Sequence, residues 1–441
     1  MESVPQSGQE LAQATQEVLK QFLRPFIDIF PDRRLQRNGE ALIRGLIVGQ
    51  SPHITKAMWT GVEQSTSAWA QAKRGYRLLH NPRVTTWQWT KSLYRLAQRT
   101  VREEGADTLV VAIDPVQFEK PYARRVEGVS QVYKSTPPDL KGQARLTWGY
   151  PAITATVVNL LRPATTYAHW FSYQTGTFRS QNREIQRAVR MTRALFPDKR
   201  LCFVLDAVGD DRKFFAWVEA VQGTFVVRVG HPERAVEVWN ERLQRWESIT
   251  IRELMEVVLW QGTFKVEVHR GGETWYKKVR LGWYRLRLPE NGQVLSLVVV
   301  NNLTKAKEDD EERLFGLLTN RAVQSLEQAQ GVYNDWRLRH RIEDGYRFQQ
   351  EAGLNIEQVM VHSLEGMQRL FVAVLWAMHF ITHILASWPQ EVLKWLQWLG
   401  GQIPPTRYRN GLYRLFWGLG RLWLAFSTLH LMLYHPPPTF G

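Results

Sequence analysis

Short apolar runs and amphipathic helical patterns alternate over the second quarter of the chain. The β-branched run at 108–113 and the apolar run at 201–205 each predict a strand buried on both faces, and an aspartate directly follows each run. Other patterns predict strands at 152–160, 164–173 and 224–229, and amphipathic helices at 181–196 and 212–220. The order is three strands followed by helix, strand, helix and strand, which predicts an α/β core over residues 105–230.

Helical patterns dominate the residues before this core. Apolar residues recur every three or four positions over 39–48 and 55–79, and Ser51-Pro52 and Asn81-Pro82 are turn signals. The segment 53–81 fits a helix-turn-helix-like unit with Gly61 at its turn, and an ordinary helical bundle is the alternative. The sequence therefore predicts a helical region over residues 1–104.

The second half of the chain begins with a β-rich segment. Alternating runs such as FKVEVHR and WYKKVRLGWYRLRL, with glycine-containing turns between them, predict antiparallel hairpins over residues 231–325. A long helix is predicted from Ser325 to Glu351, and helical patterns broken at prolines follow it. The predicted parts are a helical region (1–104), the first part of the α/β core (105–230), a β-rich insertion (231–325), the second part of the core (326–388) and a helical C-terminal region (389–441).

The charge of the chain indicates the kind of partner. Lys and Arg number 57 against 42 for Asp and Glu, so the formal net charge is +15. A charge of this sign and size favours a polyanion, nucleic acid before an anionic membrane. The stretch 370–388 has no Lys, Arg, Asp or Glu and is near the lower length limit for a membrane span. Because it contains His379 and His383, we predict a buried helix and no membrane partner.

The cysteine content and the first residues favour a cytoplasmic location. Cys202 is the single cysteine, so no intrachain disulfide can form, which fits a reducing compartment. It lies in an apolar run, which predicts an inert core residue, and no Cys/His cluster has the spacing of a zinc finger. The N-terminal residues lack the basic start and apolar centre of a signal peptide.

Three acidic residues are the candidates for chemistry. Asp114 and Asp206 follow the two buried strands, and ligand sites in open α/β sheets lie at the carboxyl ends of strands. Glu343 lies on the long predicted helix, on a face that it shares with Trp336, Arg339, Arg347 and Gln350. Turn or cap aspartates and a solvated helix face are the alternatives. Three converging carboxylates would suit two Mg²⁺ ions about 3.5–4 Å apart, as phosphodiester chemistry requires.

Three motifs resemble those of a known family, the DDE transposases of bacterial insertion sequences, in the subgroup with a β-strand insertion before the catalytic glutamate. They are VVAIDPVQFEK at 110–120, FVLDAVGDDRKFF at 203–215 and WRLRHRIEDGYRFQQ at 336–350. The third matches the spacing of the family signature Y-x2-R-x3-E-x6-K, with Arg339 at the Arg place and Glu343 at the Glu place. Trp336 replaces the Tyr, and Gln350 replaces a Lys that would contact phosphate.

The resemblance implies an RNase H-like core in which Asp114, Asp206 and Glu343 bind Mg²⁺, with Mn²⁺ as a substitute, and an N-terminal DNA-binding region. It also implies that the protein binds double-stranded DNA at terminal inverted repeats, cleaves the element's ends and transfers the strands to target DNA. A homodimer in the synaptic complex and a place in the nucleoid of a prokaryote are further implications.

Six residues are expected to contact DNA: Lys120, Trp336, Arg339, Arg347, Gln350 and Trp283. Arg339 and Arg347 share the face of Glu343 and would reach phosphates near the scissile bond. The insertion carries five tryptophans, Trp239, Trp246, Trp260, Trp275 and Trp283. Most are expected in the core, but at least one is expected near the acids, stacked on an unpaired base. Cations flank Trp283 on both sides, which makes it the first candidate.

Other interpretations remain. Another RNase H-like nuclease would share the carboxylates without needing the insertion. A catalytically inactive, DNA-binding relative would explain Gln350, and a membrane-associated protein would explain the stretch 370–388. If one metal ligand is misassigned, the substitutes are Asp210, Asp211 and Asp344.

Overall fold

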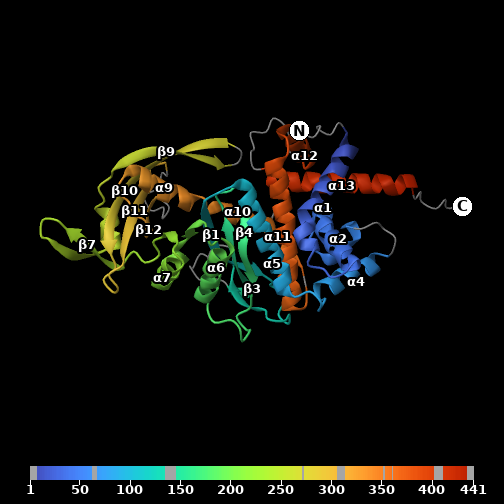
Figure 1. Cartoon of the computed structure of the whole chain (residues 1–441), viewed down its shortest axis with the longest axis horizontal. Helices are drawn as coiled ribbons and strands as arrows, with labels where there is room; N and C mark the ends of the chain where they lie inside the picture. Colours follow the sequence, from blue (N-terminus) through green and yellow to red (C-terminus); the bar gives the residue numbers. More distant parts are fainter. Residues whose placement is uncertain are drawn as a thin grey trace.

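The computed structural model describes residues 7–61, 67–134, 146–270, 273–304, 313–350, 353–359, 361–401 and 411–434. Over these ranges the fold is mixed α/β, with 13 α-helices and a sheet of 12 strands, so the predicted α/β class is confirmed. Figure 1 shows an elongated molecule. The strands of the insertion form one end, the N- and C-terminal helices form the other, and the strands that carry the candidate aspartates lie between them.

Five strands form the middle of the sheet, in the order β4 (Ala164–Trp170), β3 (Leu146–Val157), β1 (Thr108–Glu119), β5 (Arg200–Leu205) and β6 (Thr224–Arg228). β3 is antiparallel to both β4 and β1, whereas β1, β5 and β6 are parallel to one another. A short strand, β2 (Ser130–Tyr133), pairs with the start of β3. Parallel neighbours need a crossover, which α7 (Arg212–Ala220) provides between β5 and β6, while α6 (Gln181–Leu195) precedes β5.

Side chains of β1 and β5 alternate between two hydrophobic cores. Val111 and Phe203 face a core that the sheet shares with α5 (Thr86–Glu104), α6 and α7. Val110 and Val204 face a second core, shared with α9 (Leu326–Arg337) and α10 (His340–Gln350). Both faces of these strands are therefore buried, which is the physical reason for their uninterrupted apolar runs.

The insertion continues the central sheet. Its elements are β7 (Ala235–Asn240), β8 (Arg245–Thr250), α8 (Ile251–Glu256), β9 (Gly262–Arg270), β10 (Glu273–Arg287), β11 (Val294–Asn302) and β12 (Leu314–Thr319). β12 pairs antiparallel with β6, with Leu318 opposite Val227, and β11 and β10 follow outward. The predicted antiparallel strands are present, and they are hydrogen-bonded to the α/β core at β6.

The N-terminal and C-terminal helices pack together in one helical unit, whose apolar core also includes side chains of β1, β3 and β4. Its helices are α1 (Gly8–Ile27), α2 (Arg33–Gly49), α3 (Ile54–Gly61), α4 (Ala68–Leu79), α11 (Leu364–Ser387), α12 (Gln390–Leu399) and α13 (Leu412–Tyr434). They share a single apolar core. One buried polar contact joins the two ends of the chain: the indole Nε1 of Trp423 donates to Oγ1 of Thr15 at 2.8 Å.

Helix α11 is the apolar stretch that raised the membrane question. It is long and apolar enough to cross a membrane by length and composition, and 72% of its most apolar window is buried inside the structure. Trp376 and Phe380 of α11 pack against Phe22 of α1. This burial is typical of the core helix of a folded domain, as the sequence predicted.

The long helix predicted from Ser325 to Glu351 is wrong, because it is broken after Arg337. Leu338 and Arg339 connect α9 to α10. Around this break the backbone N–H groups of Arg339 and Ile342 donate to carbonyl oxygens three residues back instead of four. The backbone therefore forms tighter, 3₁₀-like turns between the two helices.

Candidate active site

Asp114 and Asp206 lie at matching positions of two neighbouring parallel strands. The register of β1 with β5 aligns Ala112 with Val204, and each aspartate comes two residues further along its strand. Asp206 follows the last residue of β5, as predicted. Asp114 is not at a strand end, because β1 continues to Glu119 by antiparallel pairing with β3. Asp114 lies instead just past the last residue of β1 that pairs with β5. Both aspartates therefore lie where β1 and β5 stop pairing.

The guanidinium of Arg339 connects Asp206 with Glu343. Its Nη2 lies 2.8 Å from Oε1 of Glu343 and 3.7 Å from Oδ2 of Asp206. These two carboxylate oxygens are therefore no farther apart than the sum of the two distances. Residues from β5 and α10, remote in sequence, thus share one counter-ion.

Electrostatics tie Asp114 to the same cluster. Burial raises the pKa of Asp114 to about 7, with smaller contributions from the carboxylates of Glu343 and Asp206, while the positive charge of Arg339 opposes the rise. Burial also raises the pKa of Glu343, but hydrogen bonding to His340 and the charge of Arg339 outweigh it, so the pKa is lowered overall. Asp114 therefore senses the charges of Glu343, Asp206 and Arg339.

Two side chains that the sequence analysis missed also belong to this cluster. Nδ1 of His340 lies 3.1 Å from Oε2 of Glu343. The buried hydroxyl of Tyr346 donates to the main-chain oxygen of Asp114 at 2.6 Å and lies 2.6 Å from Oγ1 of Thr154. Both lie three residues from Glu343, so helical spacing was the signal that could have found them.

Arg339 is itself held in place by an aromatic side chain. Its guanidinium carbon lies 6.0 Å from the centre of the Trp336 ring, which packs in turn on Phe315. The Arg339 side chain is buried, and its Nε has no hydrogen-bond partner in the described part of the chain. The position of Trp336 is therefore that of a support for Arg339, and its contact with DNA stays a prediction.

The three acids offer carboxylate oxygens, the kind of ligand that suits a magnesium ion, and one of these oxygens makes no hydrogen bond within the described residues. Oδ1 of Asp206 is buried and has no hydrogen-bond partner among the described residues. Carboxylate oxygens are the protein ligands that Mg²⁺ prefers. Within the described ranges, however, no three His, Cys, Asp or Glu side chains already form a group that could hold a metal. Arg339 lies between Asp206 and Glu343, so metal binding requires its guanidinium to withdraw.

The substitute ligands have other roles. Asp210 is buried, and its carboxylate accepts from the backbone N–H groups of Gly230 and His231 and pairs with Arg234. Asp211 caps α7, with Oδ1 accepting from the backbone N–H of Lys213 at 2.6 Å. Asp344 lies beside Glu343 in sequence and lines a cavity between α10 and α11.

Lys120 does not fit the DNA contact expected for it. It is 3% exposed, and its Nζ donates to the carbonyl oxygens of Ile356, Glu357 and Val359, in and after the 3₁₀ turn η2 (Ile356–Gln358). Burial lowers the pKa of Lys120 to about 7, which the charge of Glu357 partly offsets. All three donors of the ammonium are used within the chain, so a phosphate would have to displace a carbonyl.

Gln350 is engaged in the same place. Its Nε2 donates to the carbonyl oxygen of Gln117 at 3.0 Å and to Oε1 of Glu357 at 3.2 Å. The amide therefore joins α10 to β1 and η2, which does not fit a free phosphate contact. Arg347, by contrast, is exposed and can reach a ligand in solution.

Trp283 of the insertion lies away from the acids. Trp283 is half-buried on β10, which is separated from β5 by β6, β12 and β11. At about 4.8 Å between neighbouring strands, this places β10 roughly 20 Å from β5. Trp239 is 41% exposed and packs against Trp246, and Trp260 lies under Arg280. The side chain of Trp275 lies outside the described residues. Trp283 therefore does not join the acid cluster, and stacking on DNA stays a prediction.

A second charged feature lies on the helical unit. A groove of about 1200 Å³ between α2 and α4 is lined by six arginines, Arg33, Arg34, Arg37, Arg44, Arg74 and Arg77. Glu40 is the acidic residue among the side chains described along this groove. All but Arg44 of these arginines are exposed. The groove is therefore a strongly cationic surface.

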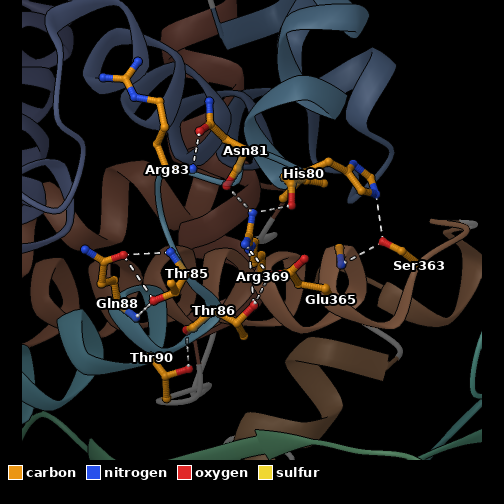
Figure 2. A network of polar contacts seen from close by, with 12 residues as sticks. His80, Asn81, Arg83, Thr85, Thr86, Gln88, Thr90, Ser363, Glu365 and Arg369 are labelled. Carbon is orange, nitrogen blue, oxygen red and sulfur yellow. Dashed lines mark hydrogen bonds and ion pairs between the residues drawn. The ribbon is translucent and has the colours of Figure 1, made fainter.

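One wall of this groove is fixed by a polar network that reaches across the helical unit. Figure 2 shows the buried Arg369 of α11 pointing into the turn between α4 and α5. Its Nη1 donates to the carbonyl oxygens of Leu79 and Asn81 at 2.9 and 3.0 Å. His80 lies 2.7 Å from Oγ of Ser363, the N-cap of α11. These contacts hold the end of α4 in a defined position relative to α11.

In comparisons with known proteins, the chain matches no protein-family profile and no curated protein sequence.

Proposed function

We propose that this protein is a DNA transposase of the DDE type, with an RNase H-like catalytic core. In this proposal it binds the terminal inverted repeats of its element as a homodimer, cleaves DNA at the ends and transfers the strands to target DNA. The observation that carries the proposal is the meeting of Asp206 and Glu343 on the guanidinium of Arg339, with Asp114 alongside.

The topology around the acids supports the RNase H-like assignment. The strand order β4-β3-β1-β5-β6, with three antiparallel strands followed by two parallel additions, is the arrangement expected for such a core. The acids occur on β1, directly after β5 and on a helix that follows the β-rich insertion. Each position agrees with the family resemblance of the three motifs.

The residues of the cluster would divide the work as follows. Asp114, Asp206 and Glu343 would hold Mg²⁺, or Mn²⁺ in its place, which supplies activation of the attacking oxygen and stabilisation of the leaving oxygen. Arg339, once released from Glu343, would donate hydrogen bonds to a phosphate oxygen of the bound DNA. Tyr346 would keep β1, and with it Asp114, at a fixed distance from α10.

The cationic groove favours a transposase over a nuclease that needs only the acids. Six arginines lie on α2 and α4, helices that carry none of the three acids, as expected for a surface that binds DNA outside the cleavage site. Phosphate contacts of this kind supply most of the salt-dependent affinity for DNA. A catalytically inactive DNA-binding relative shares this groove, so cleavage is what separates the two.

The test is cleavage of a labelled duplex that carries the ends of the DNA segment encoding the protein, with and without Mg²⁺. We expect nicks or breaks at the ends only with the metal, and loss of cleavage with retained DNA binding for Asp206→Asn and Glu343→Gln. Asp198→Asn, on an exposed residue, is the matched control. Binding without cleavage by the unaltered chain at any Mg²⁺ or Mn²⁺ concentration would leave an inactive relative, and cleavage of unrelated duplexes at the same rate would leave a general nuclease.

A further inference from the structure

The partners of Arg339 differ in kind from those of its neighbour Arg341. The guanidinium of Arg341 donates to three carbonyl oxygens within residues 158–161, so its departure would leave backbone acceptors unpaired. The guanidinium of Arg339 pairs with the carboxylates of Glu343 and Asp206 and, among the described residues, with no other acceptor. Arg339 can therefore leave its place without stranding a backbone group, provided that another cation neutralises the two carboxylates.

The guanidinium of Arg339 competes with any other cation for these two carboxylates. Its Nη2 lies 2.8 Å from Oε1 of Glu343 and 3.7 Å from Oδ2 of Asp206. A divalent cation bound to either oxygen would lie against the guanidinium, and two positive charges at such a distance repel each other. Arg339 and a divalent cation therefore exclude one another at this pair of carboxylates.

The two carboxylates are accessible from solution, whereas Arg339 is largely covered. The side chains of Asp206 and Glu343 are each 38% exposed, and that of Arg339 is 10% exposed. A phosphate of a bound duplex can therefore approach the ion pair from solution. Guanidinium and phosphate form strong, often bidentate hydrogen bonds, so a phosphate supplies the alternative partner that draws Arg339 away from the carboxylates.

We propose that Arg339 is an autoinhibitory counter-ion, which blocks divalent metal binding by Asp206 and Glu343 until a phosphate of bound DNA removes it. Metal and DNA then bind cooperatively, because both favour the state in which Arg339 has left the carboxylates. The protein holds metal weakly until DNA arrives, which restrains hydrolysis away from the DNA ends. This inference rests on the proposed function, since it takes Asp206 and Glu343 as metal ligands.

The first test is the affinity of the protein for Mn²⁺ without DNA, measured from free Mn²⁺ by electron paramagnetic resonance. We expect Arg339→Gln to bind Mn²⁺ at least about tenfold more tightly than the unaltered chain, within the usual range of coupling between sites. Arg347→Gln removes the same charge from an exposed residue of α10 and should change the affinity less than about twofold, because solvent screens it. Adding Asp206→Asn to Arg339→Gln should abolish the gain.

A second variant covers the case in which Arg339→Gln fails to fold. Arg339→Met keeps a long side chain beside the Trp336 ring and should show the same gain in Mn²⁺ affinity. A saturating duplex should tighten Mn²⁺ binding by the unaltered chain at least about fivefold, after subtraction of Mn²⁺ bound by the duplex alone. The duplex should have a smaller effect on Arg339→Met, which has no guanidinium to remove.

The outcomes separate this inference from the proposed function. Equal Mn²⁺ affinity with and without Arg339, at a site that Asp206→Asn abolishes, would overturn the counter-ion role and leave the proposed function standing. An equal effect of the duplex on the unaltered chain and on Arg339→Met would also overturn it. Absence of any Asp206-dependent Mn²⁺ site, with or without duplex, would overturn both.

Discussion

The hydroxyl of Tyr346 donates a 2.6 Å hydrogen bond to the main-chain oxygen of Asp114. This bond joins the helix of Glu343 to the strand of Asp114, two elements more than 200 residues apart in the chain. We predict that Tyr346→Phe lowers DNA cleavage about tenfold while duplex affinity stays unchanged, since Asp114 loses its tether to α10. Removing the hydroxyl also leaves Oγ1 of Thr154 without this partner, so the free energy of unfolding should fall by about 1–2 kcal/mol.

The control for that variant is Tyr333→Phe on α9, a buried tyrosine whose hydroxyl has no hydrogen bond to a described residue. Cleavage at a saturating duplex concentration, measured beside urea unfolding, separates the two effects. Equal losses of cleavage for Tyr346→Phe and Tyr333→Phe would mean that the bond to Asp114 has no special role in positioning.

The stability of the protein should depend on pH through Asp114. Its pKa is raised from 3.8 to about 7 in the folded chain, chiefly by burial, so the unfolded chain releases this proton first as the pH rises. Stability is therefore lost progressively between about pH 4 and pH 7. Asp114→Asn, which cannot ionise, should be more stable than the unaltered chain at pH 8 by on the order of 2 kcal/mol, and little different at pH 4.

Urea unfolding in the presence of a chelator measures this effect without interference from metal ions. Asp198→Asn, on an exposed aspartate, should change stability by the same small amount at both pH values. A gain for Asp114→Asn that is equal at pH 4 and pH 8 would contradict the raised pKa.

Lys120 should matter for folding and not for DNA binding. Lys120→Met leaves three carbonyl oxygens around η2 without their donor, so we expect the free energy of unfolding to fall by about 3 kcal/mol. The salt dependence of duplex binding by the folded variant should not change. Lys213→Met, on an exposed lysine of α7, should alter stability by less than about 0.5 kcal/mol. A weaker salt dependence of duplex binding by Lys120→Met would contradict this prediction and would support a phosphate contact of Lys120.

The cationic groove should account for much of the salt dependence of DNA binding. We predict that Arg37→Gln and Arg77→Gln each reduce the slope of log affinity against log salt by about 1, because each removes one phosphate contact. Fluorescence anisotropy of a duplex at several salt concentrations measures the slope. Arg242→Gln, in the exposed turn between β7 and β8 at the far end of the molecule (Figure 1), should leave it unchanged. If all three variants showed the same slope of log affinity against log salt, the groove would not be part of the DNA-binding surface.

The parts of the fold that could be predicted are those dictated by local patterns. The apolar runs before Asp114 and Asp206 mark strands buried on both faces, and this burial is visible in the sequence because every side chain of such a strand must be apolar. The amphipathic helices α6 and α7 could also be predicted, because their buried residues recur every three or four positions on one face. The pairing of β1 with β5 then brings the two aspartates to one place.

The parts that could not be predicted depend on contacts between distant segments. Nothing near Lys120 in the sequence predicts that carbonyl oxygens in and after η2, more than 230 residues later, accept hydrogen bonds from its ammonium. The break between α9 and α10 is equally hidden, since Leu338 and Arg339 are both acceptable within a helix. The tertiary contact beside this turn, between Arg339 and Asp206, joins residues more than 130 positions apart and leaves no local signal in the sequence.

The pairing of β12 with β6 has a practical consequence for anyone seeking a smaller version of the protein. If residues 231–325 were excised, the N–H and C=O groups of β6 that now pair with β12 would be left unpaired at an exposed sheet edge. Such an edge can pair with a strand of another molecule. Val226 and Val227 would also lose neighbours that now bury them from solvent. We expect a chain shortened in this way to aggregate. A smaller version should keep β12 paired with β6 and remove only strands or turns beyond β12 in the sheet order.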